Sequence, residues 1–291
     1  MKIKTAAKIN LALDVTGRLE NGYHLLESVF QTVGLYDEIT VELTEKDISI
    51  SCELPEMFAD SDPIPCDERN IAYKAAKLFF EFVGIDSGCR IHIRKGIPSQ
   101  AGMGGGSTDA AAVLYCLSKL SGRELPQAEL AAMGKKLGAD VPFFFTGGTA
   151  FVSGIGEEIA PLPDWSGRTL VIAKGKEGVS TGEAYSRIDA LTLPVHPDAK
   201  GLAEAIKSSP DKAHRFFGNL FEQAIRLDEI ERIKSEMRGR GALASLMTGS
   251  GSAVFGLFSS DTEADSCAEE LRKMSFFAQT CKTVSASFID M

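Results

Sequence analysis

A glycine-rich segment, GIPSQAGMGGGST at residues 96–108, constrains the fold of this chain more than any other feature. It runs directly into a pattern in which Val113, Leu114, Leu117 and Leu120 share one face, which predicts a helix. Glycine permits positive φ and lets a backbone approach a ligand closely. Free amides and the dipole at a helix N-terminus attract anions. We therefore expect the segment to bind a phosphate group, the alternative being a flexible loop before a capped helix.

The residues after the glycines, and the motifs that the sequence lacks, limit which class of phosphate-binding loop this can be. Ser107, Thr108 and Asp109 are typical of a helix N-terminus, and the two hydroxyls are candidates to contact a phosphate or its Mg²⁺. The sequence contains no G-x-x-x-x-G-K-[ST], no G-x-G-x-x-G, and neither H-R-D nor D-F-G. These absences disfavour the three common nucleotide-binding folds.

A lysine and an aspartate are candidates for chemistry. The alternation over residues 8–15 predicts a half-buried strand with Lys8 and Asn10 on one face. Asp140 follows a helix that is expected to end at Gly138, in a turn of the kind that carries functional side chains. A nearby lysine would hold such a carboxylate ionised. The alternative is that both are solvated side chains, because the sequence does not place them together.

Further patterns along the chain predict an α+β fold. Helices are expected over residues 69–83, 126–137, 181–188, 201–207, 228–237 and 261–274. Strands are expected over 28–33, 39–43, 89–93, 143–145, 149–152, 169–173, 243–247, 253–258 and 278–285. Asn21-Gly22 predicts a turn and residues 55–67 a loop. Strand patterns dominate before the Pro161–Trp165 turn and helical ones after it, so we expect two domains, residues 1–160 and 161–291.

Charge and cysteine usage limit the class of protein. Lysine and arginine total 31 against 40 acidic residues, and the net charge of −9 argues against nonspecific nucleic-acid binding. The six cysteines form no C-x-x-C pair, and we expect mostly buried, reduced thiols. The sequence has no continuous apolar run of the signal-peptide or membrane-span type. A cytoplasmic protein with neither a membrane nor a nucleic-acid partner is expected.

Residues 98–110, P-x-x-x-G-M-G-G-G-S-T-D-A, resemble the ATP-binding signature of the GHMP small-molecule kinases. Further blocks are similar to one branch of that family. They are A-K-I-N-L-A-L-D-V-T-G-R at 7–18, N-G-Y-H at 21–24, Q-T-V-G-L-Y-D at 31–37, G-A-D-V-P-F-F at 138–144, V-S-T-x-E-x-Y at 179–185 and T-G-S-G-S-A-V-F at 248–255. Met103 and Thr108 are conservative departures from the usual signature.

The resemblance implies roles for individual residues. Asp140 would take or orient the proton of the substrate hydroxyl, while Lys8 would keep Asp140 ionised and position that hydroxyl. The residues that would wrap the ATP phosphates are Pro98, Ser99, Gln100, Ala101, Gly102, Met103, Gly104, Gly105, Gly106, Ser107 and Thr108. The residues that would hold the rest of the substrate are Asn10, Tyr23, His24, Thr181 and Tyr185, with Tyr23, His24 and Tyr185 at the cytosine ring. The turn at 249–252 would close the site.

The resemblance also implies an activity and an architecture. The activity is that of an ATP-dependent kinase, with Mg²⁺ whose protein ligands remain unassigned, acting on a hydroxyl of a small cytidyl diphosphate substrate in isoprenoid precursor synthesis. The architecture is the two-domain α+β fold of GHMP kinases, with the active site in the cleft between domains. A GHMP kinase of the homoserine or mevalonate type and an inactive ligand sensor stay open as alternatives. Nothing in the sequence indicates an oligomeric state.

Overall fold

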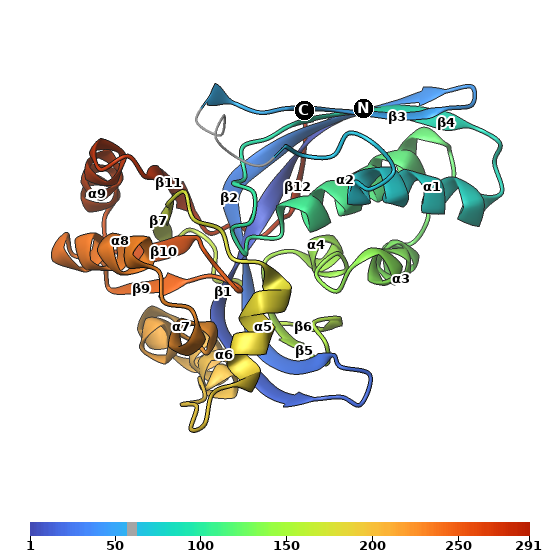
Figure 1. Ribbon diagram of the computed structural model, residues 1–291. Helices are drawn as coiled ribbons and strands as arrows, with labels where there is room; N and C mark the ends of the chain where they lie inside the picture. Colours follow the sequence, from blue (N-terminus) through green and yellow to red (C-terminus); the bar gives the residue numbers. More distant parts are fainter. Residues whose placement is uncertain (57–62) are drawn as a thin grey trace.

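The computed structural model describes residues 1–56 and 63–291, which form two β-sheets with helices packed against them (Figure 1). The strands are β1 (Lys2–Arg18), β2 (His24–Thr44), β3 (Ile48–Glu53), β4 (Gly88–Arg94), β5 (Thr149–Ser153), β6 (Glu158–Pro161), β7 (Thr169–Lys174), β8 (Gly218–Asn219), β9 (Ala244–Met247), β10 (Val254–Phe258), β11 (Phe277–Lys282) and β12 (Phe288–Asp290). The helices are α1 (Ile71–Val83), α2 (Gly105–Leu120), α3 (Gln127–Leu137), α4 (Phe143–Thr146), α5 (Thr181–Asp189), α6 (Ala199–Ser208), α7 (Phe221–Ala224), α8 (Asp228–Gly239) and α9 (Asp261–Lys273), with a 3-10 helix at Pro210–Phe216. The predicted α+β class is confirmed.

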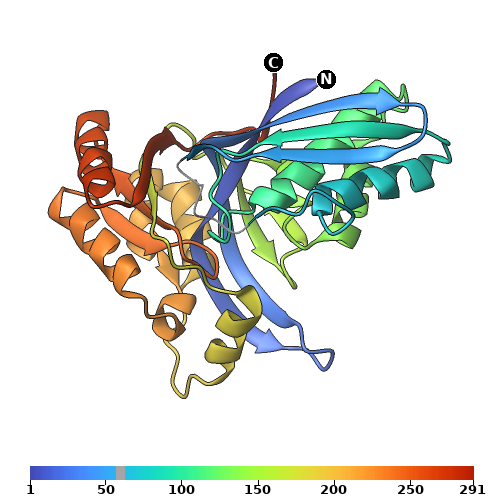
Figure 2. The ribbon, with the colours of Figure 1, turned by 45° about the horizontal axis from the view of Figure 1, so that its top comes forward.

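A long antiparallel hairpin of β1 and β2 is the centre of the first sheet. The strand order is β12-β1-β2-β4-β3, with β5 and β6 extending from β2 and β8 pairing with β1. The β1–β2 register shifts at three bulges, which bend the hairpin. Consequently β2 pairs with β4 near one end and with β5 near the other. Figure 2 shows the hairpin running between the two lobes of the molecule.

The second sheet has the antiparallel order β11-β7-β10-β9. Helices α8 and α9 contact it and bury an apolar face of Ile230, Ile233, Met237, Leu271 and their neighbours. Two segments from this half of the chain return to the first sheet, because β8 and β12 both pair with β1. The two lobes are therefore joined through β1.

The helices of the first lobe begin and end where the sequence indicates. Asn70 caps α1 by accepting a hydrogen bond from the amide of Ala72, and Gly84 ends that helix with a φ of 67°. Helix α3 ends at Gly138, as expected. Helix α2, which lies between α1 and α3 in the sequence, packs against α1 and against both strands of the β1–β2 hairpin. Its residues 110–114 are wholly buried. Helix α2 is thus a core element from Thr108 onward, whereas its first three residues, 105–107, are less buried.

Two expectations about strands are wrong. Residues 143–145 form the short helix α4, because Pro142 adopts helical angles and one helical turn buries Phe143, Phe144 and Phe145 together, whereas a strand would alternate them. Strand β1 is buried on both faces over residues 5–15, because the glycine segment and the turn after β9 cover its polar face. The loop expected at 55–67 falls partly outside the described residues, since 57–62 are not described.

The described cysteines are all free thiols, and four of them are buried (Cys89, Cys116, Cys267 and Cys281). Burial raises the pKa of Cys89 and of Cys281 to about 12 in each case. Such thiols are protonated and unreactive at neutral pH, in agreement with the expected reduced state. Within residues 1–56 and 63–291, no helix combines the length and the apolar run that crossing a membrane requires.

Candidate active site

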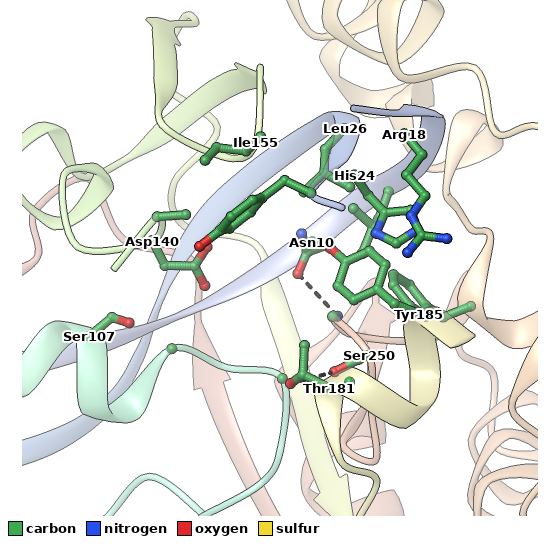
Figure 3. A pocket seen from close by; sticks show the side chains of 18 of the residues that line it. Asn10, Arg18, His24, Leu26, Ser107, Asp140, Ile155, Thr181, Tyr185 and Ser250 are labelled. Carbon is green, nitrogen blue, oxygen red and sulfur yellow. Dashed lines mark hydrogen bonds between the residues drawn. The ribbon is translucent and has the colours of Figure 1, made fainter. Parts of the chain in front are cut away.

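A cavity of about 730 Å³ lies between the β1–β2 hairpin, the start of α2, helix α5 and the turn that follows β9 (Figure 3). Its walls come from segments that are far apart in the sequence. The lining includes every side chain that the sequence analysis assigned to catalysis or to the substrate, and also Ser107 from the segment assigned to the ATP phosphates; the catalytic and substrate residues are Lys8, Asn10, Tyr23, His24, Asp140, Thr181 and Tyr185. The structure therefore brings those separate motifs together at one site.

Lys8 and Asp140 are neighbours in this cavity. Lys8 Nζ lies 3.4 Å from Asp140 Oδ2, and the side chains of Lys8 and Asp140 are 5% and 33% exposed. The same ammonium group lies 4.3 Å from the centre of the Phe30 ring, where a cation is favourably placed. Lys8 projects from β1, whereas Asp140 lies in the turn between α3 and α4. The pair therefore presents a partly exposed carboxylate that is held beside a buried cation.

Asn10 fixes Lys8 and joins the two halves of the molecule. Its Oδ1 accepts hydrogen bonds from Lys8 Nζ at 2.9 Å and from the amide of Gly249 at 3.0 Å. Its Nδ2 donates to Ser28 Oγ at 3.0 Å, and its backbone amide donates to Thr248 Oγ1 at 3.0 Å. Asn10 is only 1% exposed. It therefore positions Lys8 and the turn after β9, and because Asn10 also lines the cavity, its contact with the substrate stays a prediction.

The N-terminus of α2 is open toward the cavity. The helix begins at Gly105, before the Ser107, Thr108 and Asp109 residues that were expected at its N-terminus, and its N-cap is Gly104 at φ 71° with no side-chain cap hydrogen bond. A β-carbon at Gly104 would lie 2.9 Å from Phe144 Cζ and 3.2 Å from Lys8 Cγ, so glycine is required by both space and φ. Because no side chain occupies the cap, the first amides of α2 remain available to an anion.

The glycine segment also lines a second cavity, of about 390 Å³, on its other side. The segment residues that line it are Pro98, Ser99, Gln100, Ala101, Gly102, Met103, Gly104, Gly105 and Gly106. Gly102 and Gly104 line both cavities, so the two spaces meet at this backbone. Thr108 lies apart from them. It is fully buried, its hydroxyl is hydrogen-bonded to Thr5, and its amide donates to Gly104, so the expected contact of its hydroxyl with phosphate is not supported.

A cluster of buried charged side chains contacts both ends of the glycine segment. Lys95 Nζ contacts carboxylates of Asp37 and Asp109, and Asp37 Oδ1 also accepts hydrogen bonds from the amides of Gly96 and Ile97. Burial alone would lower the pKa of Lys95, but the charges of Asp109 and Asp37 outweigh it and raise that pKa. Burial raises the pKa of Asp109 well above its ordinary value. The cluster thus joins both ends of the segment to β2.

Aromatic and charged groups form the opposite end of the cavity. The rings of His24 and Tyr185 stack with centroids 4.4 Å apart and an interplanar angle of 20°. His24 Nε2 lies 2.8 Å from Asp189 Oδ1, and Arg18 Nη1 lies 2.9 Å from Asp189 Oδ2. Burial, with a smaller contribution from Asp140, raises the pKa of Tyr185 to about 12. Tyr23 also lines the cavity but is 60% exposed at the hairpin tip.

The turn after β9 forms part of the cavity wall. The whole turn at 249–252 was expected there, but only its first two residues line the cavity. Gly249 and Ser250 line the cavity, and Ser250 Oγ lies 3.4 Å from Thr181 Oγ1 (Figure 3). Ser252 lies elsewhere, because its hydroxyl donates to the carbonyl of Glu177 and the residue is buried. Thr181 is the first residue of α5, and the capping residue Ser180 accepts from the amide of Glu183.

Sequence reasoning missed several residues of the site. Arg18 and Asp189 line the cavity, as does Phe30 beneath Lys8. A signal for Asp189 was present, because it lies four residues after Tyr185 and directly follows the helix predicted over 181–188, so one more helical residue gives it the same face as Tyr185. No local pattern links Asp37 or Phe30 to the site, because their positions depend on the pairing of β2 with β1 and β4.

Two family models match the chain. The GHMP kinases N terminal domain matches residues 70–148, and the GHMP kinases C terminal model matches residues 195–275. The first match covers α1, the glycine segment, α2, α3 and Asp140. Both models therefore agree with the resemblance found in the sequence.

Similar proteins extend over almost the whole chain. A 4-diphosphocytidyl-2-C-methyl-D-erythritol kinase of Clostridium botulinum (strain Eklund 17B / Type B) is 44% identical over 94% of this chain and 96% of its own length. A protein of the same name from Clostridium tetani (strain Massachusetts / E88) is 42% identical over the same shares.

Solved structures of similar proteins also match nearly the whole chain. A crystal structure of 4-(cytidine 5'-diphospho)-2C-methyl-D-erythritol kinase has a TM-score of 0.76 at 33% identity, covering 97% of this chain and 98% of its own. Homoserine kinase from Cytophaga hutchinsonii has a TM-score of 0.77 at 18% identity, covering 99% of this chain and 96% of its own, and at that identity it supports the fold alone. By these relationships the chain belongs to the GHMP kinases and, within them, to the 4-diphosphocytidyl-2-C-methyl-D-erythritol kinase family.

Proposed function

We propose that the protein transfers the γ-phosphoryl group of ATP to the 2-hydroxyl of 4-diphosphocytidyl-2-C-methyl-D-erythritol, in the non-mevalonate route to isoprenoid precursors. The observation that carries the proposal is the Lys8–Asp140 pair, 3.4 Å apart, in the same cavity as Gly102 and Gly104 at one end and the His24–Tyr185 stack at the other. A phosphate loop, an acid–base pair and an aromatic end are the three parts that this reaction needs.

Asp140 acts on the hydroxyl that receives the phosphoryl group. A hydroxyl is a poor nucleophile, and a carboxylate within reach helps as its proton leaves. Lys8 contacts Asp140 Oδ2 and, through its positive charge, stabilises negative charge that develops nearby. Asn10 Oδ1 and the Phe30 ring hold Lys8 in place. Most of the catalysis is alignment, as is usual in phosphoryl transfer.

The glycine segment binds the nucleotide phosphates. The uncapped amides at the start of α2 fit an anion, and the backbone at Gly102 and Gly104 is shared by the two cavities. Phosphate charge is neutralised by Mg²⁺ when it is bound with the nucleotide. The described residues contain no group of three or more His, Cys, Asp or Glu side chains that could hold a metal ion. Ser107, which lines the main cavity, is the hydroxyl placed to assist.

The aromatic end favours a cytidyl substrate over a smaller one. Stacking and edge contacts from His24, Tyr185 and Tyr23 suit a planar base, whereas mevalonate and homoserine offer no ring to those side chains. We place the reaction in the cytoplasm, because the described thiols are free and a reducing compartment suits them. The two domains are taken as residues 1–160 and 161–291, with the cavity between them.

A coupled assay of ADP release tests the proposal. The cytidyl substrate, mevalonate and homoserine are supplied in parallel with ATP and Mg²⁺, and Asp140→Asn protein is the matched blank. Turnover of the cytidyl substrate alone is expected. Equal or faster turnover of mevalonate or homoserine would replace the proposal by that of a different GHMP kinase. ATP binding by calorimetry without turnover of any of the three would favour a ligand sensor.

A further inference from the structure

Asp189 occupies an unusual place at the aromatic end of the cavity. Its two carboxylate oxygens contact different side chains of the hairpin, since Oδ1 lies 2.8 Å from His24 Nε2 and Oδ2 lies 2.9 Å from Arg18 Nη1. Asp189 itself is the last residue of α5, one turn beyond Tyr185. The ring of His24 is thus held by Tyr185 across its face and by Asp189 at one nitrogen, and both contacts come from α5. Figure 3 shows His24, Arg18 and Tyr185 gathered at this end.

These contacts decide which nitrogen of His24 carries the hydrogen. A carboxylate oxygen only accepts hydrogen bonds, so a neutral imidazole beside Asp189 must carry its hydrogen on Nε2. The other nitrogen, Nδ1, has no hydrogen-bond partner among the described residues, and His24 lines the cavity. Nδ1 is therefore left as an acceptor at the edge of the cavity.

Resting on the proposed function, we propose that Asp189 is a positioning residue for base selectivity. It holds His24 as the Nε2–H tautomer, so that Nδ1 accepts a hydrogen bond from the exocyclic amine of a cytosine base. Uracil has a carbonyl oxygen at the corresponding position, which would set one acceptor against another. A site built for a hydrogen bond rejects a ligand that leaves its groups unpaired. Arg18 supports the arrangement by fixing the second oxygen of Asp189.

The decisive variant is Asp189→Asn. An asparagine side chain has nearly the same shape, but its amide either donates to Nε2 or accepts from it, so it no longer selects one tautomer. We expect the kcat/KM preference for the cytidyl over the uridyl substrate to fall by roughly tenfold, the effect of about one hydrogen bond. Glu183→Gln is the matched control, because it removes another exposed carboxylate–arginine pair of α5, with Arg187 at 2.6 Å. Its preference is expected to equal that of the parent.

A second measurement is independent of activity. Nitrogen-15 NMR of labelled histidine, with His24→Ala to assign the signal, reports the tautomer in the parent at a pH where imidazole is neutral. We expect hydrogen on Nε2 in the parent and a mixture of tautomers in Asp189→Asn. Hydrogen on Nδ1 in the parent, or a base preference that Asp189→Asn leaves unchanged, would overturn the inference. A parent that uses neither nucleotide substrate would instead contradict the proposed function, and the NMR result would still decide whether Asp189 sets the tautomer.

Discussion

At the transfer end of the cavity, formed by Lys8, Asn10, Asp140 and the glycine segment, Lys8 and Asn10 are only 5% and 1% exposed. At the base end, formed by Arg18, Tyr23, His24, Tyr185 and Asp189, Arg18 and Tyr23 are 58% and 60% exposed. A backbone hydrogen bond from the amide of Lys8 to the carbonyl of Met103 fixes the strand of the transfer end to the glycine segment, and Asn10 bonds to Thr248 and Gly249 of the other half.

The base end has a different construction, because it forms only where the hairpin tip meets α5 from the other half of the chain. Its contacts are side chain to side chain. The comparison indicates that backbone pairing fixes the residues of the chemistry, whereas substrate choice depends on side-chain contacts between the hairpin tip and α5. Changes at the transfer end should therefore affect turnover, and changes at the base end should affect KM.

The largest effect is expected from Asp140→Asn. The amide cannot take a proton from the substrate hydroxyl, so kcat should fall by roughly 10²–10⁴, the range for loss of an acid–base group. The melting temperature should change little, because Asp140 is partly exposed. Steady-state kinetics and a thermal melt check both points, with Asp265→Asn, an exposed carboxylate on α9, as the control. Full activity would remove Asp140 from the mechanism.

A smaller effect at the same end is expected from Gly104→Ala. The new methyl would lie 2.9 Å from Phe144 Cζ at a φ of 71°, so the segment must shift. Backbone strain of about 1–3 kcal/mol corresponds to a loss of up to roughly 100-fold in kcat/KM for ATP. Gly122→Ala is the matched control, since Gly122 has a φ of 66° after the other end of α2 and no atom within 4 Å of the added carbon. Similar losses of kcat/KM in both variants would show that φ strain alone, and not the phosphate site, is responsible.

At the base end, His24→Ala should raise KM for the cytidyl substrate by roughly tenfold while kcat changes less. Base contacts of this kind are worth about 1–3 kcal/mol, and they act equally in the ground state and the transition state. We expect the lower part of that range, because Tyr185 remains. Substrate titrations at saturating ATP measure both constants. A fall in kcat with KM unchanged would place His24 at the transfer end and break the comparison.

The smallest effect is expected from Tyr185→Phe. The ring that stacks on His24 is kept, so kcat/KM should change by less than about threefold. The raised pKa of Tyr185, about 12, keeps the phenol neutral at all ordinary pH values, so its ionisation cannot shape the pH–rate profile there. Profiles of the parent and the variant should superimpose between about pH 6 and pH 10. A limb that disappears in the variant would assign a titrating role to this phenol.

The parts of the molecule that sequence could predict are those with a local signal. The strand that carries Lys8, the helix after the glycines and the stop at Gly138 all follow from periodicity and glycine chemistry. The alternation in Ile48–Glu53 is a further local signal, and it corresponds to β3. Helix α4 was mistaken for a strand because three phenylalanines in a row have no period, and only the packing of the core shows that a helical turn buries them together.

The candidate site likewise contains features that a local sequence signal predicts and features that depend on packing. Lys8, Asp140 and the glycine segment were found as motifs, but their proximity depends on β1 passing beneath the segment, which no local pattern encodes. Thr108 was assigned to phosphate by its place in a motif, yet its side chain points into the core and contacts Thr5. The direction of a side chain on the first turn of a helix is set by packing, so the motif could not predict it.

Strand β1 has consequences beyond the site, because its neighbours come from distant parts of the chain. Besides β2, it pairs with β8 at Gly218–Asn219 and with β12 at Phe288–Asp290. A fragment that stops near residue 160 would lack both partners, and one side of β1 would present unpaired amide and carbonyl groups. Such an edge is a template for strand addition between copies. The last residues of the chain therefore protect the first strand from self-association, and the half that contains the phosphate loop should aggregate when it is made alone.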